Sequence, residues 1–283
     1  MQEEKETSVL LDALTSYWAD RAHSYSAQNI AEMNDWRCRA WRELILSYAP
    51  QKDRLRILDV GTGPGFFAIN LSLAGHDVTA VDVTEHMLWH AKANAESYGA
   101  SVDFMLHRGE FLPFEQDSFD LIVSRNVIWN LEYPEQALSE WKRVLVPGGR
   151  MVYFDANWYL YLYDDKLRAE KEAAHAAFHA KHIPHHHAGD LPPKRVAELE
   201  QAAYTLPLSQ KRRPAWDRTV LQNLGMQVKK IIDDIGPGVQ HPLDWERDAP
   251  IHTFMVCAEK PLQKAQTDAQ HPNTALAADE RIG

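Results

Sequence analysis

The sequence predicts an α/β protein with a Rossmann-like, mostly parallel sheet of seven strands and helices on both faces. Apolar runs of strand length alternate with helical periodicity between residues 55 and 155, a glycine-rich turn follows the first run, and two more runs come near the C-terminus. Crossovers between the parallel strands should be right-handed. We expect an N-terminal helical lid at 1–50, a core at 51–156, a helical substrate-cap insertion after strand five at 157–220, the end of the sheet at 221–260 and a disordered tail at 261–283.

The composition is typical of an acidic, soluble enzyme. Among 283 residues, Lys+Arg 30 stand against Asp+Glu 40, which gives a net charge of −10 and argues against a nucleic-acid partner. Cys38 and Cys257 are too few for a disulfide framework and favour a reducing compartment. The N-terminal segment lacks the apolar region of a signal peptide, and no run of about 20 apolar residues occurs. We expect a cytoplasmic monomer or homodimer that acts on a small molecule, away from membranes.

Residues 7–50 have helical spacing. We expect a break around Ser24–Asn29 and a second helix that runs to Tyr48 and is closed by Pro50. Two interpretations stay open for the aromatic N-terminal helix: aromatic side chains packed on the core, or a lid over the glycine turn. The apolar and aromatic positions are Leu10, Leu11, Leu14, Tyr17 and Trp18.

The core follows as alternating strands and helices, punctuated by glycine and proline. Gly75 and Gly99 are expected to end the first two helices, and Thr84 to begin the second. The expected strands are 56–60, 77–81, 102–106, 119–124, 150–155, 226–232 and 252–258, and the expected core helices are 66–74, 85–98 and 134–144.

The segment 157–219 interrupts this alternation and is expected to cover the carboxyl ends of the strands. Helices are predicted at 164–180 and 194–204, and six of the 14 histidines lie in it. A solvated histidine-rich loop without metal is our expectation. The alternative is a site for zinc, nickel or copper built on His175, His179 and His182.

The glycine-rich turn predicts a nucleotide-like ligand. Gly61, Gly63 and Gly65 allow a tight turn and close approach to a ligand, at the start of a helix whose N–H groups favour an anion. A dinucleotide fold places its third glycine where Phe66 stands here, which counts against a dinucleotide. Asp82, at the end of the second strand, can accept both ribose hydroxyls.

At this point the chain resembles the class I SAM-dependent methyltransferases, in particular their small-molecule branch. The resemblance covers Leu55 to Asp155 and rests on five segments in order. They are I-L-D-V-G-T-G-P-G (57–65), V-T-A-V-D-V-T-E-H-M-L (78–88), R-G-E-F-L-P-F (108–114), S-F-D-L-I-V-S-R-N-V-I-W-N-L (118–131) and W-K-R-V-L-V-P-G-G (141–149).

The resemblance implies S-adenosylmethionine (SAM) as the cofactor and assigns residues to each part of it. Residues around the methionine portion would be Asp59, Gly61, Thr62, Gly63 and Gly65, with Arg125 facing its amino group through a backbone carbonyl and Tyr25 closing over the sulfonium. Residues around the nucleoside would be Asp82 on the ribose, Val83 and Met87 against the adenine, Glu110 on its amino group and Phe111 on the ring.

Structural interpretations stay open for several of these residues. The glycines could serve the turn alone, and Asp82 could be a charge at a helix N-terminus. Met87 could belong to the core, Arg125 could form a surface salt bridge, and Tyr25 could be a core aromatic.

Methyl transfer is an in-line displacement at an already activated carbon, so orientation and desolvation carry most of it. Where a general base is needed, Asp155 is the candidate by position, with Asn130 and Trp129 at the end of strand four as further catalytic candidates. A helix-capping role for Asp155 is the alternative. The leading function is a small-molecule methyltransferase. The alternatives are a catalytically silent SAM-binding sensor or partner subunit, and a protein or RNA methyltransferase. The acceptor and the atom methylated stay open.

Overall fold

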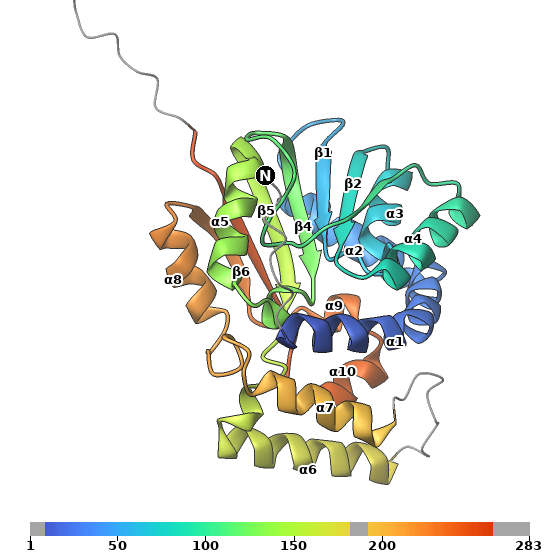
Figure 1. Cartoon of the computed structure of the whole chain (residues 1–283), viewed down its shortest axis with the longest axis vertical. Helices are drawn as coiled ribbons and strands as arrows, with labels where there is room; N and C mark the ends of the chain where they lie inside the picture. Colours follow the sequence, from blue (N-terminus) through green and yellow to red (C-terminus); the bar gives the residue numbers. More distant parts are fainter. Residues whose placement is uncertain (1–8, 182–191, 263–283) are drawn as a thin grey trace, which may run out of the picture.

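The computed structural model describes residues 9–181 and 192–262, which form one sheet with helices on both faces (Figure 1). The seven strands follow the order β3-β2-β1-β4-β5-β7-β6, and β7 runs antiparallel to both of its neighbours. The predicted fold class is therefore confirmed. The strands are β1 Arg56–Val60, β2 Asp77–Asp82, β3 Asp103–Leu106, β4 Phe119–Arg125, β5 Leu145–Asp155, β6 Gln227–Ile232 and β7 Phe254–Glu259.

The strand order reverses at β1, which pairs in parallel with β2 on one side and β4 on the other. In open α/β sheets the crevice at such a reversal, beside the carboxyl ends of the strands, is where ligands bind. The helices that connect these strands are α3 (Phe66–Leu73), α4 (Glu85–Tyr98) and α5 (Pro134–Val144), as predicted.

Alternate side chains along the strands belong to two apolar clusters, one on each face of the sheet. Leu58 and Ile122 point to the face covered by α5 and by α8 (Ala215–Asn223). Their neighbours Ile57 and Val123 point to the face covered by α2 (Trp36–Tyr48), α3 and the short α9 (Gly236–Val239). This two-sided burial is why the strands read as nearly continuous apolar runs.

The N-terminal helix α1 (Val9–Met33) is unbroken, so the break predicted around Ser24–Asn29 is wrong. The polar side chains there find distant partners, because Asn94 donates to Ser26 Oγ (3.1 Å) and Arg125 donates to Asn29 Oδ1 (3.3 Å). The chain breaks at Asn34–Asp35 instead, where Asp35 caps α2. Figure 1 shows α1 lying across the carboxyl ends of the strands.

The insertion lies on the far side of α1 from the sheet (Figure 1). It contains a 3-10 turn, η2 (Leu160–Leu162), then α6 (Asp165–Lys181) and α7 (Pro193–Ala203), close to the two predicted helices. Helix α7 contacts α1, and α6 contacts α10 (Pro242–Asp248). The sequence reading missed α8, α9 and α10. The predicted tail lies largely outside the described residues.

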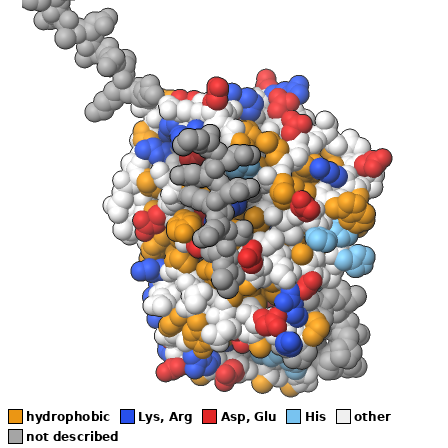
Figure 2. All heavy atoms as spheres, in the orientation of Figure 1, with side chains coloured by type: hydrophobic (Ala, Val, Ile, Leu, Met, Phe, Trp, Pro, Cys, Tyr) orange, Lys and Arg blue, Asp and Glu red, His pale blue; other side chains and the backbone are white. Residues whose placement is uncertain are grey.

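Within the described ranges, no helix is both long and apolar enough to cross a membrane. Lys and Arg side chains are interspersed with Asp and Glu over the face shown in Figure 2.

Candidate functional site

A cavity lies at the reversal of strand order, between α1 and the carboxyl ends of β1, β2 and β4. Its walls come from α1, the turn after β1, the end of β2 with the start of α4, the loop after β3, and the end of β4 with the 3-10 turn η1 (Ile128–Asn130). A concave site with convergent polar groups at this position of the fold is the candidate binding site.

The glycine turn forms the floor of this cavity. Gly61 and Gly63 both line it and have positive φ, 68° and 55°. A Cβ on Gly61 would lie 2.2 Å from a Val127 methyl, so this position has no room for a side chain. A Cβ on Gly63 would face the Tyr25 ring at 3.5 Å, inside the space that a ligand would need. Thr62 lies between them and also lines the cavity.

Gly65 does not line the cavity, although the resemblance places it at the cofactor. It occupies the N-cap of α3 with φ 93°. A Cβ there would lie 3.0 Å from Ile69 and 3.3 Å from Ala91 on α4. Its role in this structure is the close packing of α3 against α4.

Asp59 is buried at the end of β1. Its carboxylate accepts hydrogen bonds from Thr62 Oγ1 (2.7 Å) and from Ala68 N (3.1 Å). Burial raises the pKa of Asp59 to about 7, and the two hydrogen bonds only partly offset this effect. The side chain therefore holds the turn in shape and places a titratable group at the cavity wall.

Asp82 ends β2 and is also buried. One oxygen accepts from Gly63 N (2.8 Å) and the other from Thr84 N (2.9 Å), so the carboxylate ties β2 to the glycine turn. Burial raises its pKa, against the effect of these hydrogen bonds. A carboxylate can accept about four hydrogen bonds, which leaves capacity on both oxygens for two hydroxyl donors.

The residues expected around adenine divide into two groups. Val83, Met87 and Glu110 line the cavity. Phe111 does not; its ring lies under the Arg108 guanidinium, 5.6 Å from the ring centre. Arg108 also donates to Glu110 Oε1 (3.2 Å), which fixes the buried carboxylate at the cavity wall.

Arg125 ends β4 and lines the cavity, with its side chain 12% exposed. The guanidinium lies 4.6 Å from the Phe66 ring centre and donates to Glu32 Oε2 (2.7 Å) and to Asn29 on α1. Burial alone would lower the pKa of Arg125, but the Glu32 carboxylate outweighs burial and raises it. The surface salt bridge considered from the sequence is therefore a largely buried one.

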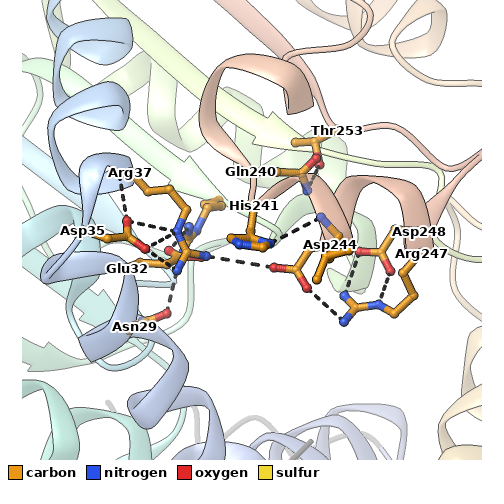
Figure 3. Close-up of polar contacts among 12 residues, drawn as sticks. Asn29, Glu32, Asp35, Arg37, Gln240, His241, Asp244, Arg247, Asp248 and Thr253 are labelled. Atoms are coloured by element: carbon orange, nitrogen blue, oxygen red, sulfur yellow. Dashed lines mark hydrogen bonds and ion pairs between the residues drawn. The ribbon is translucent and has the colours of Figure 1, made fainter. Parts of the chain in front are cut away.

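Glu32 extends this contact into a polar network at the junction of α1 and α2 (Figure 3). Arg37 lies 3.6 Å from Glu32, binds Asp35 through two nitrogens and reaches Asp244 of α10 at 4.0 Å. The C-terminal end of α1 is thus held by charges from β4 and α2, and the network continues to α10.

Tyr25 lines the cavity from α1, beside Gly63. The next residue, Ser26, is buried and accepts from Asn94 of α4, which also donates to Pro64 O (3.0 Å). Helix α1 is therefore anchored to the glycine turn, and Tyr25 faces the floor of the cavity.

Asp155 does not line the cavity. Arg213 binds its carboxylate, which also accepts from Trp129 N (2.9 Å) and Ala156 N (2.9 Å). Arg213 also binds Asp217 of α8 (2.7 Å), and both members of the Arg213–Asp155 pair are about 1% exposed. This arrangement speaks against the predicted general base, because the carboxylate is shielded from any acceptor and held by a buried cation.

Of the other two catalytic candidates, Asn130 lines the cavity and Trp129 does not. Asn130 can accept from the Trp18 indole N–H (3.0 Å) while donating to Val127 O (2.5 Å). Trp129 is buried and donates to Asn126 O (3.0 Å). Both side chains are used in shaping the turn after β4.

His175 and His179 lie on α6 with their Nε2 atoms 3.0 Å apart. His182 lies outside the described residues. Among the residues that the structure describes, no group of three or more His, Cys, Asp or Glu is placed to hold a metal.

The sequence left open which way the apolar face of α1 points, and it gave no role to Asn126. Leu11, Leu14, Thr15 and Trp18 line the cavity, whereas no described residue of the insertion does. Their helical spacing was visible in the sequence, but not which way that face points. Asn126 also lines the cavity with φ 59°, and its Oδ1 is buried without a hydrogen-bond partner among the described residues.

Comparison with known proteins agrees with this geometry. Residues 58–153 match the Methyltransferase domain family. The chain is 36% identical to demethylmenaquinone methyltransferase of Thermus thermophilus over 117 residues. This aligned segment is 41% of this chain and 53% of that protein. It is 38% identical over 112 residues to malonyl-[acyl-carrier protein] O-methyltransferase of Erwinia pyrifoliae, covering 39% of this chain and 41% of that protein.

These matches span about half or less of the two relatives. The fold is also similar to that of a SAM-dependent methyltransferase from Aquifex aeolicus, with a TM-score of 0.50, 20% identity, and coverage of 82% of this chain and 97% of that one. The matched segment, 58–153, covers the central strands of the seven-stranded sheet, so this part of the chain carries a methyltransferase domain.

Proposed function

We propose that this protein binds SAM in the cavity and transfers its methyl group to a small-molecule acceptor. One observation carries the proposal. The buried Asp82 carboxylate lies at the edge of the cavity, and its two oxygens accept hydrogen bonds from Gly63 N in the glycine turn and from Thr84 N. Such a carboxylate suits a ligand with two adjacent hydroxyls.

The remaining groups of the site fit the other parts of SAM. The buried, unpartnered Oδ1 of Asn126 is an acceptor that suits an ammonium group. The fixed Glu110 carboxylate suits an amino group, and Met87 and Val83 supply apolar surface for a ring. Bound SAM supplies a methyl group on a positively charged sulfur.

The chain's own contribution to such a reaction is orientation and exclusion of water. The glycine turn, Asp82 and Asn126 fix the position of the cofactor, and α1 closes the cavity from the side opposite the strands. Since Asp155 is shielded, we assign it no role as a base toward the acceptor.

The two relatives are named for acting on demethylmenaquinone and on malonyl-acyl-carrier protein. Their matched core and this cavity support a small-molecule acceptor in preference to a nucleic acid. We also propose a cytoplasmic location and a monomer or homodimer.

Calorimetry with SAM tests the proposal. Asp82→Ala should weaken binding by roughly 100-fold, because it removes two charge-assisted hydrogen bonds and loosens the turn. The matched control is Asp77→Ala at the other end of β2, where the side chain is exposed and pairs with Arg54; its affinity should equal that of the parent. Equal affinities in all three proteins would refute the ribose assignment.

Formation of S-adenosylhomocysteine (SAH) separates an enzyme from a silent SAM-binding protein. With SAM and a small-molecule extract supplied, SAH should accumulate with the parent protein and with Asp77→Ala, and not with Asp82→Ala. Binding without SAH formation in the parent would favour the silent sensor.

A further inference from the structure

The cavity wall formed by α1 is a continuous face of one helix. Leu11, Leu14, Thr15 and Trp18 recur at helical spacing, and the same face continues to Tyr25 and Asn29. At 1.5 Å per residue, Leu11 lies about 21 Å along the axis from Tyr25. The wall therefore extends well beyond the part that faces the glycine turn.

The charged side chains that line the cavity all lie on the opposite side, at the strand ends and the loops after them. Each of these groups already has a partner: Asp59 and Asp82 accept backbone N–H groups, and Arg125 pairs with Glu32. Arg108 binds Glu110 and Glu132. The remaining titratable group on that side is His107, and the described lining residues of α1 carry no Asp, Glu, Lys, Arg or His.

Trp18 is the largest side chain of this uncharged wall, and its neighbours fix its position. It packs on Trp129 with ring centres 6.4 Å apart and on Tyr25 at 5.9 Å. With the Asn130 amide turned so that both of its polar atoms find partners, its oxygen accepts from the Trp18 indole N–H. In that orientation the one polar atom of the indole is satisfied, and the ring offers carbon surface to the cavity.

The wall is also backed by apolar groups. Leu14 belongs to a buried cluster with Trp129, Leu199, Ala203 and Leu206, which joins α1 to η1 and α7. A charged group placed against the segment from Leu11 to Trp18 would lose hydration, and no lining residue of that segment supplies a counter-charge.

We infer that the acceptor is an uncharged, largely apolar aromatic molecule, which lies against Trp18 and the leucines of α1. Aromatic rings pack well against an indole and lose little solvation in an apolar chamber. Selection among acceptors then rests on the face of α1 between Leu11 and Trp18, and the insertion acts by supporting that face from behind. This inference rests on the proposed function, since it assigns the acceptor of that same site.

Three probes with one ring system and different charges test the inference. The SAH-loaded protein is titrated at pH 7.5 with 2-naphthol (neutral), 2-naphthoate (anionic) and 2-naphthylmethylamine (cationic), after SAH binding has been measured alone. We expect 2-naphthol to bind at least about tenfold tighter than either ion. Equal or tighter binding of an ion, or no binding of any probe, would overturn the inference while leaving SAM binding intact. Failure of SAH itself to bind would overturn the proposed function and this inference together.

Variants of α1 locate the acceptor. Trp18→Ala should weaken 2-naphthol binding at least about tenfold and leave SAH affinity within about twofold, whereas Trp36→Ala, at an exposed tryptophan outside the cavity, should change neither. Leu11→Lys, at a partly exposed position, should reverse the order of 2-naphthol and 2-naphthoate, because it supplies the missing counter-charge. Unchanged preference in Leu11→Lys, with SAH still bound, would contradict the placement.

Discussion

Asp59 shows how burial sets the charge of a single residue. Its pKa of about 7 in the folded chain lies above the ordinary value near 3.9, so the folded state holds a proton that the unfolded state releases. The stabilisation from this proton is fully present below about pH 4 and is lost as pH rises through about 7.

This gives a prediction for pH dependence without ligand. Between pH 4 and pH 8, the parent should lose about 4 kcal/mol of unfolding free energy relative to Asp59→Asn, whose side chain stays neutral. Urea unfolding at several pH values measures the difference. Asp77→Asn, at an exposed carboxyl, should run parallel to the parent. A parent and Asp59→Asn whose profiles run parallel would contradict the raised pKa.

Gly63 and Gly75 both have a positive φ, but only Gly63 lies at the cavity. Both have positive φ, 55° and 94°; a Cβ on Gly63 faces the cavity, and one on Gly75 meets nothing within 4 Å. Each change to alanine should cost about 1 kcal/mol of stability from strain. Only Gly63→Ala should also reduce SAM affinity, by roughly tenfold or more, which calorimetry checks. A similar loss in both variants would point to a general loosening of the fold.

At the scale of elements, Arg213 joins three of them. It binds Asp155 at the end of β5 and Asp217 of α8, and Asp155 in turn holds the backbone of η1 through Trp129 N. Arg213 is buried, and the pKa of its guanidinium is raised because these two carboxylates outweigh burial, which alone would lower it.

The neighbouring Arg212 and Arg213 allow a matched test of the buried contacts of Arg213. Arg213→Ala should cost about 3–5 kcal/mol, because it leaves two buried carboxylates unpaired. Arg212→Ala should cost less than about 1 kcal/mol, since Arg212 is 74% exposed and pairs with Asp164 at the surface. Chemical denaturation of both variants measures the contrast. Equal costs would show that the buried network contributes no more than a surface pair.

Local patterns in the sequence predicted the sheet and the glycine turn well, because strand runs, turn glycines and helix caps are encoded within a few residues. What they could not predict depended on distant partners. Helix α1 continues through Ser26 and Asn29 because Asn94 and Arg125 bind those side chains. The environment of Asp155 is decided by Arg213, 58 positions away. The orientation of the α1 face that lines the cavity is set by packing on α7 and η1. Helical periodicity within α1 cannot predict that packing.

For the whole molecule, binding and stability are linked by mass action. A ligand that binds only the folded chain at 100 times its dissociation constant should add about 2.7 kcal/mol to the unfolding free energy. SAH should therefore raise the thermal midpoint of the parent and of Asp77→Ala. Asp82→Ala should show little shift at the same SAH concentration. A full shift in Asp82→Ala would contradict the assigned role of that carboxylate.

The unbroken α1 has a consequence for access to the site. A helix with a break at Ser24–Asn29 would consist of two segments that could move separately, one over the glycine turn and one carrying the Leu11–Trp18 face. Since the chain breaks only at Asn34–Asp35, α1 covers both regions as a single helix. One continuous helix cannot uncover either region independently of the other, and the Glu32–Arg125 ion pair, close to the junction with α2, holds its C-terminal end against β4.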